Sequence, residues 1–115
     1  MHLHTLQNSN VMSESLLKDL IIEKLCTVYD PEVPVNIWDL GLIYDIRFVK
    51  SDEVIIQMTL TAPGCPIADQ IVQQVHDVVV EVEGINSATV DLVFEPMWTP
   101  DKMSDVARLE LGYGL

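Results

Sequence analysis

The strand-to-helix turn at residues 59–66 constrains the fold of this chain more than any other stretch. Residues 54–60 form an apolar, alternating run, which predicts a β-strand. After Pro66, apolar residues recur at helical spacing, at Ile67, Ile71, Val75, Val78 and Val82. A strand–helix–strand connection of this length favours a right-handed crossover, so the strands on either side of the helix should be parallel.

Cys65 occupies the centre of this turn. Proline suits the first helical position, because its missing N–H would be unpaired there, so Pro66 places Cys65 near the helix N-cap. Unpaired N–H groups and the helix dipole favour an anion there, and such a thiol tends to have a lowered pKa. Cys65 is therefore either an activated nucleophile or metal ligand, or a small residue buried in the turn.

Length and composition narrow the class of protein. A chain of 115 residues, 49% of them hydrophobic, fits one domain, expected over residues 13–115 after a polar, flexible extension at 1–12. Two cysteines make no disulfide framework, which favours a reducing cytoplasm. No apolar run reaches the roughly 18 residues of a membrane span. The net charge of −12 argues against nucleic acid or anionic membranes as partners.

In the N-terminal part of the domain, the sequence pattern predicts a helix that begins after Ser13, a residue suited to the N-cap. Its apolar stripe consists of Leu17, Leu20, Ile21, Leu25 and Val28. The helix should end near Tyr29, because Asp30 precedes a proline and is disfavoured from helical geometry. Cys26 lies inside this predicted helix and is expected to be a packing residue.

Two more strands complete the predicted sheet. Residues 44–48 alternate and should pair antiparallel with residues 54–60, and residues 88–94 alternate as a third strand. The intervening helix should end at Glu83 and Gly84. The expected fold is α+β: a small mixed three-stranded sheet, an antiparallel hairpin plus a parallel β-α-β crossover, packed with about three helices.

The last of these helices should begin with Thr99 as its N-cap and Pro100 at its first position, and reach Gly112. The loop at 30–42 is apolar enough to pack on the domain. Its carboxylates, Asp30, Glu32 and Asp39, either converge on a cation or serve as capping and turn residues.

Several chemistries are excluded by residue count and spacing. The chain has no Cys-x-x-Cys pair, so one chain cannot build a four-thiolate site. His76 lies 11 residues after Cys65 in the same predicted helix, about 16 Å away, too far to act as its base. His76 is expected to be structural or solvent-facing, and the protein is not expected to be an enzyme.

Five ordered segments resemble the SufT and PaaD-like family of the iron–sulfur cluster assembly domain superfamily. They are DPEVPVNI at 30–37, DLGLIY at 39–44, TAPGCP at 61–66, EPMWTPDKMS at 95–104 and ARLELG at 107–112. The chain departs from the usual family pattern at Met97, where a second proline is usual, and in its N-terminal extension.

The resemblance implies a non-enzymatic role in maturing iron–sulfur proteins. Cys65 would be a transient ligand of iron or of an iron–sulfur cluster, with Asp30 and Glu32 as further candidate ligands. Partners would be iron–sulfur assembly proteins and client apoproteins, and two subunits of a homodimer could each offer one Cys65.

Two other functions stay open. The chain could be a protein-interaction adaptor without metal, in which Trp38 and Trp98 anchor a partner. Asp39 and Gly64 belong to the same family motifs and are candidate interaction residues. Alternatively, it could be a PaaD-like accessory of a multicomponent aromatic-ring oxygenase, which differs in client more than in chemistry.

Overall fold

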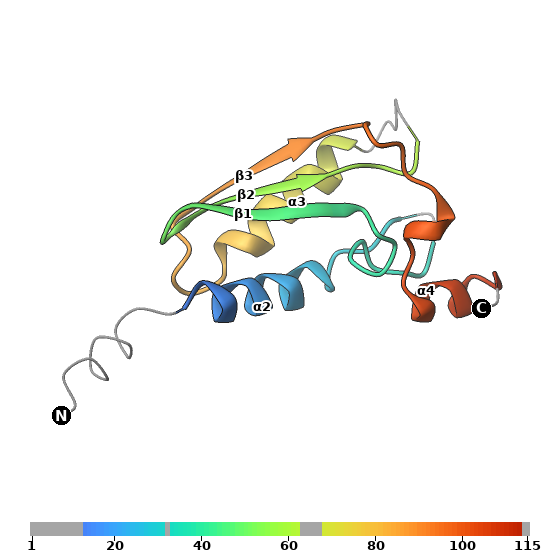
Figure 1. The fold of residues 1–115 in the computed structure, drawn as a ribbon, viewed down its shortest axis with the longest axis horizontal. Helices are drawn as coiled ribbons and strands as arrows, with labels where there is room; N and C mark the ends of the chain where they lie inside the picture. The colour runs from blue at the N-terminus through green and yellow to red at the C-terminus, as the bar shows by residue number, and fades with distance from the viewer. Residues whose placement is uncertain (1–12, 32, 63–67, 114–115) are drawn as a thin grey trace.

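A computed structural model describes residues 13–31, 33–62 and 68–113 (Figure 1). Its elements in chain order are α2 (Glu14–Leu25), β1 (Ile43–Lys50), β2 (Glu53–Met58), α3 (Ala68–Val80), β3 (Ser87–Leu92), the 3-10 turn η1 (Pro100–Lys102) and α4 (Asp105–Glu110). In the part of the chain that the structure describes, no helix is long and apolar enough to cross a membrane.

The three strands form one mixed sheet in the order β1-β2-β3. β1 pairs antiparallel with β2, and β2 pairs parallel with β3. The register sets Ile46 opposite Ile56, and Ile56 opposite Val90, so apolar side chains line up across one face. The α+β class and the mixed topology predicted from the sequence are confirmed.

Helices α2 and α3 both cover this apolar face (Figure 1). Each helix buries side chains four residues apart: Leu17, Ile21 and Leu25 from α2, and Ile71, Val75 and Val79 from α3. Burying one such aliphatic side chain stabilises the fold by roughly 1.5–3 kcal/mol. The loop at 30–42 also packs down as predicted, since Val35, Ile37, Leu40 and Leu42 are buried.

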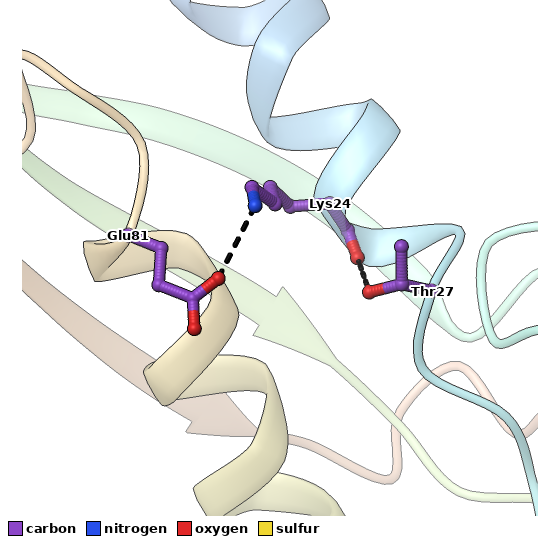
Figure 2. A network of polar contacts seen from close by, with 3 residues as sticks. All are labelled: Lys24, Thr27 and Glu81. Atoms are coloured by element: carbon purple, nitrogen blue, oxygen red, sulfur yellow. Dashed lines mark hydrogen bonds and ion pairs between the residues drawn. The ribbon is translucent and has the colours of Figure 1, made fainter.

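Polar contacts between the helices add little to this packing. Lys24, near the end of α2, forms an ion pair of 3.2 Å with Glu81, just after α3 (Figure 2). Both side chains are largely exposed, and such pairs contribute at most about 1 kcal/mol. The attachment of α2 to α3 therefore rests on their buried aliphatic residues.

The first helix is shorter than predicted: α2 ends at Leu25 instead of near Tyr29. Cys26 is its C-cap and not a residue within the helix. The Thr27 hydroxyl donates to the Lys24 carbonyl oxygen at 2.5 Å, and its N–H bonds the same oxygen, which tightens the last turn (Figure 2). Tyr29 already pairs in an isolated antiparallel bridge with Asn36.

The C-terminal helix was predicted as one element, but it is two. The 3-10 turn η1 does begin at Pro100, yet Thr99 makes no side-chain capping bond within the described part. Met103 is buried and extended, and the following Ser104 caps α4 by accepting the Ala107 N–H at 3.2 Å. Burial of Met103 and the second cap together break the helix.

The predicted ends of three other elements shift by a few residues. β2 ends at Met58 and not at residue 60, although the Thr59 N–H still donates to the Leu42 carbonyl at 2.8 Å. β3 covers 87–92 instead of 88–94. Helix α3 ends at Val80, and the turn that follows it reaches Gly84. In the last turn of the helix the fully buried residue is Val79, whereas the sequence analysis placed Val78 in the apolar stripe.

Candidate functional site

The candidate site lies where the parallel strands β2 and β3 end. Parallel strands bring their carboxyl ends to the same edge of a sheet, and the chain leaves this edge toward α3. Cys65 and Gly64, and also Glu32, lie outside the described residues. The description of the site therefore starts from its flanks.

Covalent geometry limits how far Cys65 can be from those flanks. A chain spans at most about 3.6 Å per residue. Cys65 is four residues after Thr61 and three before Ala68, so its Cα lies within about 14 Å of the first and about 11 Å of the second.

A cavity of about 190 Å³ opens at the same edge. It is lined by residues following β2 and residues following β3: Thr59, Leu60, Thr61, Phe94, Glu95, Met97 and Trp98. Met97 is 65% exposed and Phe94 39%, so part of the apolar wall faces solvent. The cavity is thus a mainly apolar hollow, and Glu95 is the one acidic residue among the lining residues that the structure describes.

Three hydrogen bonds hold the segment after β3 over the sheet edge. The Trp98 indole Nε1 donates to the Leu40 carbonyl at 2.7 Å. The Tyr44 hydroxyl donates to the Pro96 carbonyl at 2.8 Å, and the Ser104 N–H to the Asp39 carbonyl at 2.8 Å. These bonds fix one wall of the cavity to the loop at 30–42 and to β1.

The Thr59 side chain is the unusual feature of the cavity. It is 1% exposed. Burial raises the pKa of the Tyr44 phenol, and hydrogen bonding with the Thr59 side chain offsets part of that rise.

The predicted carboxylate site is only partly described. Asp39 acts as a turn residue: its carboxylate accepts from the Asn36 amide at 2.9 Å, and its N–H donates back to the Asn36 side-chain oxygen. The backbone of Asp30 bonds with Val33 and Val35 across the loop. Within residues 13–31, 33–62 and 68–113, no group of three or more His, Cys, Asp or Glu side chains could hold a metal ion.

The two tryptophans are half-buried and pack against the core. Trp98 uses its indole N–H internally, and Trp38 lies in the turn that Asp39 and Asn36 stabilise. Their packing favours a scaffolding role over that of exposed anchors. Met97 is instead the exposed apolar residue of the closing segment.

His76 faces solvent on α3, as expected. Its Nδ1 lies 3.3 Å from the Asp77 carboxylate, which also accepts from Gln73 at 2.8 Å. The Gln73 hydrogen bond, and then that of His76, lower the pKa of Asp77. This exposed cluster satisfies its own polar groups.

Cys26 provides an internal reference for thiol reactivity. Burial, and then the negative charges of Asp39 and Glu23, raise the pKa of its thiol. We predict that Cys65 reacts with a thiol reagent at least about tenfold faster than Cys26 near pH 7.5, since the thiolate is the reactive form. Peptide-level mass spectrometry after brief labelling across pH 6–10 measures both sites in one sample. Equal rates at the two cysteines would contradict an activated Cys65.

Two features of the cavity were missed from the sequence. The antiparallel register shifts between Ile43 and Asp45, so Tyr44 lies in a bulge, and its hydroxyl reaches Pro96. Strand alternation alone gives no signal for such a shift. Thr59 was assigned to the predicted strand at 54–60, whereas β2 ends at Met58. Strand alternation does not indicate that this threonine is buried.

Comparison with known proteins identifies the family to which the chain belongs. Residues 18–92 match the family model described as iron-sulfur cluster assembly protein. An Fe-S protein maturation auxiliary factor of Porphyromonas gingivalis is 50% identical over 93 residues, 81% of this chain and 89% of that protein. The Fe-S protein maturation auxiliary factor SufT of Staphylococcus aureus is 40% identical over 85 residues, 74% of this chain and 97% of that protein.

A solved structure has the same fold. The crystal structure of a domain of unknown function from Bacillus anthracis superposes with a TM-score of 0.82 at 37% identity, covering 88% of this chain and 96% of that one. The resemblance to SufT-type proteins drawn from the five sequence segments is confirmed. This chain belongs to the iron–sulfur cluster assembly protein family.

Proposed function

We propose that this protein is a maturation factor that assists delivery of iron–sulfur clusters to client apoproteins, with Cys65 as a transient ligand of iron or cluster. The observation that carries the proposal is the 50% identity, over 81% of the chain, to a protein named as an Fe-S protein maturation auxiliary factor. The role proposed is binding and transfer, without a catalytic residue. Its partners would be assembly proteins that supply the cluster and apoproteins that accept it.

The number of thiols supports a transient site. Common iron–sulfur clusters are held by about four protein ligands. Only Cys26 and Cys65 are available in the chain, and Cys26 is a C-cap on α2 whose thiol has a raised pKa. Remaining ligands would come from Asp30 and Glu32, from a small thiol, or from Cys65 of a second copy. A site with so few ligands of its own releases its cargo readily.

The packing of Trp38 and Trp98 gives the adaptor alternative no support, since both side chains are half-buried against the core. An accessory role for an aromatic-ring oxygenase would use the same site with a different client. Maturation of iron–sulfur proteins in general is therefore the function we propose.

Anaerobic reconstitution with iron, sulfide and a small thiol tests the ligand role. We expect the protein to bind iron and sulfide, and to lose both within minutes to a chelator. A site that bridges two subunits would hold about one cluster per two chains, with assembly that depends on protein concentration. Iron and sulfide analysis together with native mass determination measures this. No bound iron, or a chelator-resistant cluster in a monomer, would contradict the proposal.

A further inference from the structure

The two outer edges of the sheet are protected to different degrees. Along β1 the register shifts twice, and three charged side chains are exposed, Asp45, Arg47 and Lys50. Register shifts and edge charges are devices that prevent a sheet edge from pairing with another strand. β3 pairs with β2 over its whole length without a shift, and its sequence contains no proline, lysine or arginine. The edge at β3 therefore lacks the protection that β1 has.

Half of the peptide groups of β3 point away from the sheet. The N–H groups of Ser87 and Val93 donate to the carbonyl oxygens that precede and end β2, at 3.2 and 2.8 Å. In a parallel ladder, alternate residues direct both peptide groups to the same neighbour, so those of Ala88, Val90 and Leu92 point outward. Within the described residues, no strand pairs with this side of β3 (Figure 1).

The apolar side chains at this edge are incompletely covered. The inward side chains of β2 are fully buried, at Val54, Ile56 and Met58. Val90 lies opposite Ile56 in the register, and both Val90 and Leu92 pack against the core but stay partly exposed. One further strand beside β3 would bond the outward peptide groups and remove this apolar surface from water.

The order of side chains along β3 indicates which strand would fit. An antiparallel two-fold arrangement centred on Val90 sets the small Ala88 opposite the larger Leu92 of a second copy. On the exposed face it sets Thr89, whose hydroxyl donates, opposite Asp91 of the copy, whose carboxylate accepts. A centre at Asp91 would instead oppose two carboxylates, which is destabilising. β3 is thus complementary to itself.

We propose that β3 pairs antiparallel with β3 of a second copy about a two-fold axis at Val90, joining two three-stranded sheets into one. Val90 would exchange two N–H···O bonds with its own copy, and Ala88 with Leu92 in both directions. The carboxyl ends of the two β3 strands point in opposite directions, so the two cavities would lie at opposite ends of the joined sheet. A cluster shared between two copies would need a different interface.

Sedimentation equilibrium without iron, under a reducing agent, tests whether the chain associates. The protein is measured from about 10 µM to about 1 mM in roughly 0.5 M NaCl, which screens the repulsion between two chains of net charge −12. Because the interface is a single strand pair, we expect a monomer–dimer equilibrium with a Kd on the order of 0.1 mM. A protein that stays monomeric at the highest concentration would overturn the proposal.

Two substitutions at Thr89 test the pairing by charge. Thr89→Asp would oppose Asp91 of the copy at two symmetric places and should weaken association at least about tenfold. Thr89→Lys would pair with the same carboxylates and should tighten association about threefold. Ser15→Asp and Ser15→Lys make the same charge changes at an exposed position of α2 and should leave the Kd within about twofold. Equal effects at Thr89 and Ser15, or a Thr89→Asp variant that associates like the wild type, would overturn the proposal.

Crosslinking tests the register directly. In the proposed pairing, residue 89 lies opposite residue 91 of the copy in a non-hydrogen-bonded pair, with Cα atoms about 4.5 Å apart, which permits a disulfide. With Cys26 and Cys65 replaced by serine, Thr89→Cys/Asp91→Cys should form a covalent dimer with oxidised glutathione, which takes up the two electrons and protons as two glutathione thiols. Either single variant should crosslink far less. No covalent dimer from the double variant, or equal crosslinking by a single variant, would contradict the register.

Discussion

Replacing Gly41 with alanine should destabilise the fold by about 3 kcal/mol or more, the largest effect expected at the three described glycines. Gly41 has a φ of +81°, which an L-residue adopts at a cost of roughly 1–2 kcal/mol. An added Cβ would also lie 2.1 Å from the Lys102 carbonyl oxygen and 2.6 Å from its carbonyl carbon. Both are backbone atoms of the 3-10 turn η1, so the clash cannot be relieved by rotating a side chain.

Gly112→Ala is the matched control for this substitution. Gly112 has a φ of +80°, but no heavy atom of the described residues would lie within 4 Å of its Cβ. It should therefore lose only the cost of the positive φ, about 1–2 kcal/mol. Urea unfolding of both variants, read from the midpoints at unchanged slope, separates strain from contact. Equal losses in the two variants would show that η1 does not pack closely on Gly41.

This contact also matters for the candidate site. The turn at Gly41 and the segment after β3 are tied together by the Trp98–Leu40 and Ser104–Asp39 hydrogen bonds. Loosening the turn should therefore loosen one wall of the cavity.

The architecture could be predicted from the sequence because its main elements follow simple periods. Alternation at 44–48 and 54–60, and helical spacing from Ile71 to Val82, are local signals that survive in the folded chain. The order strand–helix–strand then favoured a crossover between parallel strands, and β2 and β3 are parallel in the structure. Ser13 was also identified as an N-cap, and its side chain does accept the Leu16 N–H at 3.1 Å.

The misplaced details depend on contacts between distant segments. Met103 interrupts the last helix because it is buried in the core, and Ser104 is turned toward Asp39 on another loop. The early end of α2 depends on the bridge between Tyr29 and Asn36 across the loop at 30–42. No pattern in either segment alone contains this information.

For the site, the sequence led to a single residue and the structure adds its surroundings. Cys65 stood out because Pro66 suits a first helical position and so placed the cysteine near a predicted N-cap, with burial in the turn as the other interpretation. The cavity is assembled from residues about 35 positions apart, after β2 and after β3, and the parallel pairing of these strands brings them together. The burial of the Thr59 side chain beside Tyr44 could be recognised only in the folded structure.

Cys65→Ser should abolish activity in cluster delivery while leaving the fold close to that of the wild type. Serine matches the size of cysteine and is a preferred N-cap residue, so the N-cap position that the sequence predicts for residue 65 should tolerate it. A serine hydroxyl stays protonated at neutral pH and replaces a thiolate poorly as a ligand of iron. The thermal midpoint should change by only a few degrees; a variant that melts far below the wild type would indicate a structural role instead.

Cys26→Ser is the matched control, since it removes the other thiol of the chain from a C-cap position outside the candidate site. It should retain the activity of the wild type. The comparison also excludes a general effect of losing one thiol.

Activation of a client apoprotein that requires a [4Fe–4S] cluster tests the maturation role most directly. The apoprotein is incubated anaerobically with iron, sulfide and a small thiol, and its enzymatic activity is followed over time, with wild-type protein, each serine variant, or no addition. We expect the wild type and Cys26→Ser to accelerate the recovery of activity, and Cys65→Ser to give the rate measured with no addition. A folded Cys65→Ser variant that accelerates recovery as well as the wild type, or a wild type that never exceeds the rate without protein, would contradict the account.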